Sequence, residues 1–307
     1  MNNRKFMNPE KTSAADAGVR PRAAFTLLEL VVVLATVGLL VVMVLPALAG
    51  TKPNSKLFQC MNNLKQLATA WTMYADDNND LLCNLSTYGS GTVGVPWRTQ
   101  ISQVTTPLPA GITANTAAAQ KYLTQMGFKQ PTPTVVGPLF AYTPNVDLVH
   151  CPADFRANLA VGIGYRGPYS WDSYCGSEYL NGEGRGGANN LSKRSNITRP
   201  SDKWIWTEAA ALRGENVGGW YMSNDGTAAY NFTDAQFGDS PAAFHVAASD
   251  FNFADGHVES HKWLDPTTVA YANYLGPNVG MTEAAAQHAG NVDAIWCARH
   301  QAGNQNP

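Results

Sequence analysis

The chain has few charged residues, which make up 14% of its 307 residues, against roughly 25% in an average soluble domain. Its Lys and Arg residues are not clustered, and the formal net charge is -2 at pH 7. Binding to phosphates needs clustered basic side chains, so we expect no nucleic-acid partner. Five cysteines are too few for a disulfide-built scaffold, and the odd number leaves at least one unpaired within the chain.

The chain also lacks the common catalytic signatures. It contains no G-x-S-x-G, no H-E-x-x-H and no Walker-type glycine loop. We therefore predict that the protein is not an enzyme and that its function follows from packing.

One long apolar run is present, from Leu30 to Ala49, and it carries no formal charge. About twenty helical residues match the roughly 30 Å hydrocarbon core of a bilayer. Residues 1–24 carry a net charge of +3, which favours a cytoplasmic N-terminus. We expect a transmembrane helix over residues 25–49, a single pass through the inner membrane and a periplasmic remainder. A secretory signal cut after Ala49 is the alternative, and Glu29 near the start of the run argues against it.

The segment Ala24 to Glu29, A-F-T-L-L-E, together with the basic leader and the apolar run, resembles the type IV pilin and type II secretion pseudopilin family. The resemblance implies that residues 1–24 are a leader peptide. It also implies that a prepilin peptidase cuts between Ala24 and Phe25 and methylates the new Phe25 amine. The family pattern has glycine before the cut, so Ala24 implies slower or more selective cleavage.

The same resemblance assigns assembly roles to two further residues. It implies that Glu29 pairs with the N-terminal amine of a neighbouring subunit, because a charge in an apolar environment needs a partner. Pro46 falls where the family has a proline that loosens the helix, as expected from a residue without a backbone donor.

Beyond the run, apolar residues recur every three or four positions, which predicts an amphipathic helix over residues 54–78. They are Leu57, Met61, Leu64, Ala68, Trp71 and Ala75. We expect this helix to be a stalk that continues the membrane helix within residues 25–80. The predicted fold class is pilin-like α+β: a long N-terminal transmembrane and stalk helix followed by a head, residues 81–307, with an antiparallel β-sheet. Prolines and glycines in residues 81–144 predict an insertion of loops and short elements.

Apolar and polar residues alternate on both sides of Asp255 and Gly256, which predicts a β-hairpin with a two-residue turn. This register places Asp250 opposite His261.

His245, nine residues, Asp255 and Gly256 also resemble a C-terminal signature of prepilin-like proteins of planctomycete and verrucomicrobial type. That signature is often accompanied by C-x-N-N-L-K-Q, which begins here at Cys60, and by C-P-A-D, which begins at Cys151. Cys60 and Cys151 are our first candidates for a disulfide between stalk and head. Other pairings, such as Cys83 with Cys175, stay open.

We expect no cofactor and no metal. Zinc at His257 and His261 is disfavoured because they lie about 13 Å apart along an extended strand. Calcium is the alternative, because major pseudopilins of the resembled family bind it near their C-terminal sheet. The oxygen donors available for it are Asp225, Asp234, Asp239 and Asp250.

The predicted function is a structural subunit of a type II secretion pseudopilus or a type IV pilus-like filament, located in the periplasm or at the cell surface after assembly. Its expected partners are other pilin or pseudopilin subunits, a prepilin peptidase, the inner membrane and a secretion or pilus assembly platform. Two alternatives remain: a minor, tip-located binding or adhesion module that uses the 81–144 insertion, and a membrane-anchored periplasmic enzyme.

Overall fold

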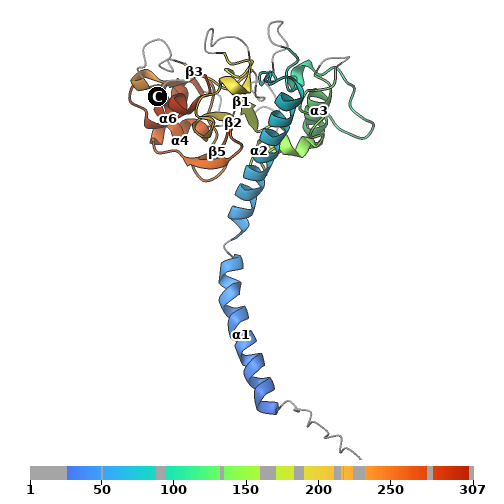
Figure 1. The fold of residues 1–307 in the computed structure, drawn as a ribbon, viewed down its shortest axis with the longest axis vertical. Helices are drawn as coiled ribbons and strands as arrows, with labels where there is room; N and C mark the ends of the chain where they lie inside the picture. The colour runs from blue at the N-terminus through green and yellow to red at the C-terminus, as the bar shows by residue number, and fades with distance from the viewer. Residues whose placement is uncertain are drawn as a thin grey trace, which may run out of the picture. The chain divides into compact units, whose positions relative to one another are not determined.

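A computed structural model of the chain forms two compact units, unit 1 over Met1–Thr51 and unit 2 over Lys52–Pro307 (Figure 1). The structure describes residues 26–49, 51–87, 94–131, 135–159, 171–182, 190–210, 216, 218–223, 232–274 and 279–303. Within these ranges, side chains are described except in residues 41–49, 51–55, 232 and 279–282.

The predicted membrane span is wrong. Over the described residues, no helix has both the length and the apolar character needed to cross a membrane. This finding overturns the expected single-pass localisation in the inner membrane. The helix at this place in the chain is α1, Leu27–Ala49.

The predicted long N-terminal stalk is also wrong. Helix α2, Thr51–Asp77, is separate from α1 and belongs almost entirely to unit 2. Its apolar stripe is buried inside that unit: Leu64, Leu67 and Trp71 have no exposed surface. The 3.6-residue period therefore marks a core helix of the head, because the head itself covers the stripe.

The rest of unit 2 consists of short helices and strands. The helices are η1 (Ile101–Gln103), α3 (Ala117–Lys129), η2 (Val146–Val149), η3 (Arg156–Asn158), η5 (Arg194–Asn196), η6 (Pro200–Asp202), η7 (Phe232–Asp234), α4 (Pro266–Ala272), α5 (Val279–Ala286) and α6 (Val292–His300). The strands are β1 (Tyr174–Gly176), β2 (Trp204–Glu208), β3 (Met222–Ser223), β4 (Gln236–Phe237), β5 (Ala248–Phe253) and β6 (Val258–Lys262).

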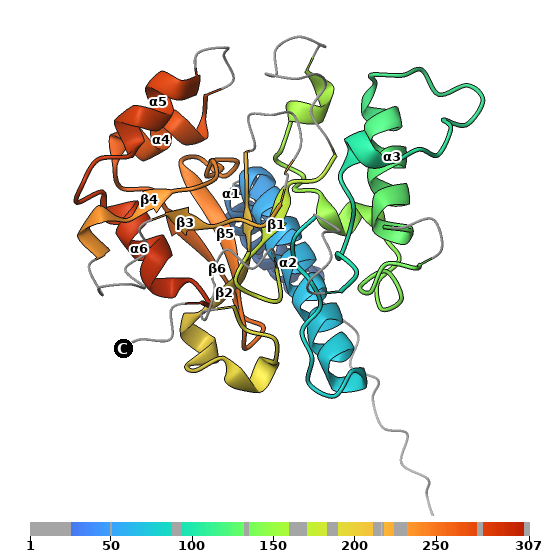
Figure 2. The same cartoon turned by 90° about the horizontal axis from the view of Figure 1, so that it is seen from above.

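The fold of unit 2 is α+β, built on a four-stranded sheet in the order β1-β2-β5-β6 with antiparallel pairs throughout. The sheet lies between α2 and α6 (Figure 2). One buried cluster joins Trp71 of α2 to Trp206 of β2, whose ring centroids lie 6.4 Å apart. A second cluster joins Trp204 and Phe251 to Cys297 of α6. The central strands are buried throughout because both faces of the sheet are covered.

The hairpin of β5 and β6 forms, but its register differs by one residue from the prediction. Asp250 lies opposite Ser260, and Ser249 lies opposite His261. The Phe253 N–H donates to the His257 carbonyl, which leaves a three-residue loop closed by Gly256 at φ +90°. Asp250 is buried with no exposed surface, because both faces of β5 are covered.

Candidate functional site

The start of α1 is a reciprocal capping arrangement. The Thr26 N–H and hydroxyl donate to Glu29 Oε2 at 2.8 and 2.9 Å, and the Glu29 N–H donates to Thr26 Oγ1 at 3.3 Å. This is a capping box, in which a threonine and the glutamate three residues later satisfy free backbone donors at a helix start. These hydrogen bonds, the backbone one first, lower the pKa of Glu29.

The residues predicted around this start are described only in part. Ala24 and Phe25, the predicted cleavage and methylation site, lie outside the described residues, as does the calcium candidate Asp225. Pro46 lies within α1. The structure therefore places the glutamate of the motif on a helix that its own threonine caps.

The head holds a second group of functional side chains, which we name the four-residue cluster. One sulfur, nitrogen or oxygen atom from each member lies within 4.8 Å of those of all the others. Its members are Cys60, Cys151, Glu208 and His245.

Four separate segments supply the members. Cys60 lies on α2, and Glu208 ends β2. Cys151 follows η2, and His245 precedes β5. All four side chains are buried or nearly so.

The contacts inside the cluster converge on Glu208 Oε1 and on His245 Nε2. The Cys60 thiol donates to Glu208 Oε1 at 3.0 Å. His245 Nε2 lies 3.1 Å from the same oxygen and 3.3 Å from Cys151 Sγ. The sulfurs, the imidazole and the carboxylate therefore all point toward one small volume.

A surrounding layer of hydrogen bonds holds these atoms in place. The Tyr174 hydroxyl donates to Cys60 Sγ at 3.0 Å, and the Ala153 N–H donates to Cys151 Sγ at 3.4 Å. The Asp250 N–H donates to Glu208 Oε2 at 3.0 Å, so the other oxygen, Oε1, faces the thiols and the imidazole. Such outer partners orient ligands and tune their affinity for a metal.

The burial of the cluster shifts several pKa values. Burial first, and the hydrogen bond with Cys151 second, raise the pKa of Cys60 well above its ordinary value. Burial by itself lowers the pKa of His245, but hydrogen bonds to Cys151 and Glu208 outweigh it and raise this pKa to about 11. Burial and the nearby Glu208 raise the pKa of Asp250 to about 7.

The cluster brings together three motifs that are far apart in the sequence. Cys60 begins C-M-N-N-L-K-Q, Cys151 begins C-P-A-D, and His245 begins the H-x9-D-G signature. Within the first motif, Asn63 donates to the carbonyls of Asp147 and His150, and so joins α2 to the segment just before Cys151. Cys60 and Cys151, the disulfide candidates, are free thiols that meet here.

Other residues of the motifs have structural roles. Asp154 of C-P-A-D accepts two hydrogen bonds from the Arg156 guanidinium, at 2.7 and 2.9 Å, in a buried ion pair. Asp255 accepts the His257 N–H at 3.0 Å, and Gly256 supplies the positive φ of the turn. The H-x9-D-G signature thus has two parts: His245 supplies a buried imidazole to the cluster, and Asp255 and Gly256 form a hairpin turn.

Sequence reasoning missed Glu208. The available signal was a carboxylate ending the strand W-I-W-T-E, whose residues are all buried, because a buried charge needs a partner.

The other candidate metal ligands lie elsewhere. His257 pairs with Asp255, and His261 lies 3.4 Å from Asp293. Asp250 Oδ2 lies 3.5 Å from His245 Nε2, at the edge of the four-residue cluster. Asp234 ends η7, and neither it nor Asp239 is a member of that cluster.

The donor set of the cluster matches metal ligation better than nucleophilic catalysis. Two thiols, one imidazole and one carboxylate are the donors that zinc takes in proteins. A catalytic triad uses one imidazole nitrogen for the nucleophile and the other for the orienting carboxylate. Here Nε2 alone faces Cys151, Glu208 and Asp250.

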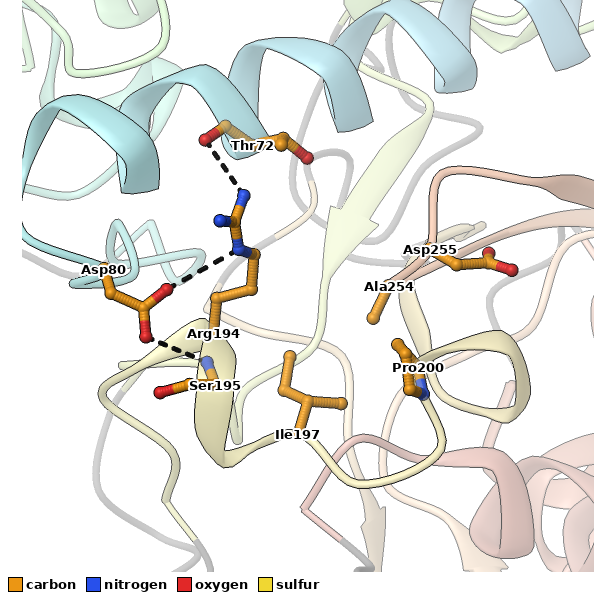
Figure 3. A pocket seen from close by; sticks show the side chains of 8 residues that line it. All are labelled: Thr72, Asp80, Arg194, Ser195, Ile197, Pro200, Ala254 and Asp255. Atoms are coloured by element: carbon orange, nitrogen blue, oxygen red, sulfur yellow. Dashed lines mark hydrogen bonds and ion pairs between the residues drawn. The ribbon is translucent and has the colours of Figure 1, made fainter.

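An open pocket of about 490 Å³ also lies on unit 2 (Figure 3). Its charged groups already have partners. Arg194 contacts Asp80 and the Thr72 carbonyl, Asp80 accepts the Ser195 N–H at 3.0 Å, and Asp255 pairs with His257 outside the lining. Its lining residues are Thr72, Asp80, Arg194, Ser195, Ile197, Pro200, Ala254 and Asp255.

No protein-family model matches the chain, and no curated protein and no solved structure shows significant similarity to it.

Proposed function

We propose that the protein is a prepilin-like structural subunit, cut between Ala24 and Phe25, methylated at Phe25 and assembled into a filament through α1. The filament is of the kind built in type II secretion or in type IV pili. The exposed apolar surface of α1 carries this proposal.

Every described side chain of α1, from Leu27 to Leu40, is exposed. Leu28 is 74% exposed and Leu34 is 63% exposed. A helix that is apolar on all sides is normally buried, and large exposed apolar surfaces mark sites of association. In the proposed filament, the α1 helices of other copies cover this surface, because they have the same length and the same apolar side chains.

The polar side chains at this end of the chain do not oppose such a cover. Thr26 and Glu29 bond each other, and the Thr36 hydroxyl donates to the Val33 carbonyl at 2.9 Å. Buried polar groups cost little once they are hydrogen-bonded. The Thr36 hydroxyl is therefore satisfied inside an apolar bundle, whereas the Glu29 charge still needs a charged partner, the role proposed for the N-terminal amine of a neighbouring subunit.

The test compares two leucine substitutions in the full chain, produced together with a prepilin peptidase and a filament assembly system. Leu34→Glu places a charge on α1, whereas Leu264→Glu changes a leucine that is 68% exposed on unit 2. We expect Leu34→Glu to lower the filament yield by at least about tenfold, because a buried unpaired carboxylate costs several kcal/mol. Leu264→Glu should leave the yield unchanged. Normal filaments from Leu34→Glu would contradict assembly through α1.

Processing is tested separately by intact mass and N-terminal sequencing, with and without the peptidase. The expected product begins at methylated Phe25 only when the peptidase is present. An intact Met1, or a cut after Ala49, would contradict the proposed maturation.

A further inference from the structure

The four-residue cluster has a shape that suits one small cation. A tetrahedral zinc ion has bonds of about 2.3 Å to sulfur and about 2.0 Å to nitrogen and oxygen, so its ligand atoms lie about 3.3–3.8 Å apart. The observed separations include 3.0 Å from Cys60 Sγ to Glu208 Oε1, and 3.3 Å from Cys151 Sγ to His245 Nε2. These two separations lie within about 0.5 Å of zinc geometry, and all four ligand atoms lie within 4.8 Å of one another.

The charge of the site also favours a dication. Glu208 and Asp250 are buried carboxyl groups with no exposed surface, and they face a single imidazole. Asp250 Oδ2 lies 3.5 Å from His245 Nε2, so this one nitrogen is shared between the two carboxyl groups and Cys151 Sγ. Two thiolates neutralise the charge of zinc, and with the Glu208 carboxylate the ligated site carries a net charge of -1.

The donors directed at the two sulfurs match the surroundings of thiolate ligands. The Tyr174 hydroxyl and the Ala153 N–H both point at sulfur atoms. Hydrogen bonds of this kind stabilise a thiolate, which is the form of cysteine that binds metal.

Backbone strain beside His245 is an independent observation. The next two residues, Val246 and Ala247, have φ values of +55° and +60°. Val246 is 88% exposed, so packing of its side chain does not explain this conformation. A β-branched residue in the left-handed region is rare, and such strain gathers at functional sites. The strained segment directly follows the imidazole that points into the cluster.

We propose that the four-residue cluster binds one zinc ion in a closed, four-coordinate structural site. The ion replaces the protons of the two thiols and joins α2, β2 and two loops of unit 2. Softer and borderline metals share this preference for sulfur and nitrogen, whereas calcium prefers oxygen. This inference concerns unit 2 and does not rest on filament assembly.

The first test measures the metal content, thiol count and intact mass of the wild-type full chain, purified without chelators. We expect about one zinc per chain and, after denaturation with a chelator, all five cysteines as reactive thiols. Zinc-free protein that stays zinc-free after reduction and addition of zinc would overturn the proposal. A metal-free chain lighter by two hydrogens, with Cys60 and Cys151 linked, would also overturn it and would show the disulfide.

The second test uses cobalt as a spectroscopic probe and compares ligand variants with a matched cysteine variant. Cys151→Ser and His245→Gln each remove one ligand, whereas Cys297→Ala changes a buried cysteine of the other core cluster. Wild type and Cys297→Ala should show thiolate-to-cobalt charge-transfer bands and tetrahedral cobalt bands. Substituting a residue that only hydrogen-bonds to a metal ligand lowers metal affinity by roughly 10–100-fold. The two ligand variants should lose more cobalt affinity than that. Equal cobalt spectra and affinities in all four proteins would contradict the assignment, and the wild-type measurement stands even where a variant fails to fold.

Discussion

Glu29 has two possible contributions to assembly that substitution by alanine cannot separate. It caps its own helix through Thr26, and in the proposed filament its charge pairs with the N-terminal amine of a neighbouring subunit. Glutamine retains the capping box, because Glu and Gln both serve at this position, but it carries no charge.

We therefore predict that Glu29→Gln and Glu29→Ala both reduce filament yield, while only Glu29→Ala loosens the start of α1. The yield is measured on sheared filaments, and the helix start by hydrogen exchange at the Thr26 amide. Wild-type assembly of Glu29→Gln would show that capping suffices and that the charge is not needed.

Asp154 provides a pH-dependent prediction in the head. Burial alone raises its pKa, but the charge of Arg156 and the hydrogen bonds it receives outweigh that effect and lower the pKa. A carboxylate whose pKa is lowered on folding stabilises the protein above its unfolded pKa, and this stability is lost as the pH falls through the folded pKa.

We predict that Asp154→Asn lowers the free energy of unfolding by about 3–5 kcal/mol at pH 7, because it leaves the Arg156 charge buried without its partner. The difference from wild type should shrink below pH about 4. Urea unfolding across this pH range measures it. Asp147→Asn is the control: its pair with Lys121 is about half exposed and is worth less than about 1 kcal/mol. An equal loss in both variants would contradict the assigned ion pair.

At the scale of elements, α2 is a core helix of unit 2 with one exposed face. Trp71 has no exposed surface and packs edge-on against Trp206, whereas Phe58 on the same helix is 67% exposed. Replacing an aromatic side chain of the buried stripe by alanine should therefore destabilise unit 2, whereas the same replacement on the exposed face should not.

Trp71→Ala should destabilise unit 2 by about 3–5 kcal/mol through the cavity it leaves. Phe58→Ala should change stability by less than about 0.5 kcal/mol. Urea midpoints of the two variants provide the comparison. If α2 were a stalk covered only by neighbouring subunits, the stability lost in Trp71→Ala would depend on the protein concentration. We expect a loss that is independent of the protein concentration.

Local sequence signals predicted the hairpin but not its register. Asp255 and Gly256 lie in the turn, as predicted. The loop is one residue longer than predicted, which changes the β6 partner of every residue in β5. The alternating pattern did not reveal this, because both faces of β5 are buried and Asp250 and Asn252 are as buried as Phe251. The contacts across the sheet, which sequence does not show, set the register.

At the scale of the whole molecule, the proposed zinc ion links segments from α2 to the start of β5. A ligand that binds only the folded state stabilises it in proportion to the logarithm of its free concentration. At free zinc about 100 times the dissociation constant, we expect the free energy of unfolding to rise by about 2.7 kcal/mol. Thermal unfolding with buffered zinc measures this. Cys151→Ser should show no dependence on zinc, whereas Cys297→Ala should behave as wild type.

The sequence by itself determined the local features: the period of α2, the turn at Asp255 and Gly256, and three motif residues of the cluster. These depend on neighbours within a few positions, so they can be read along the chain. Only the tertiary structure decided that the α2 stripe is buried by the head, that Asp250 faces inward, and that Glu208 completes the cluster. Those features depend on contacts between segments up to about 185 residues apart, between Cys60 and His245, and packing alone brings such segments together.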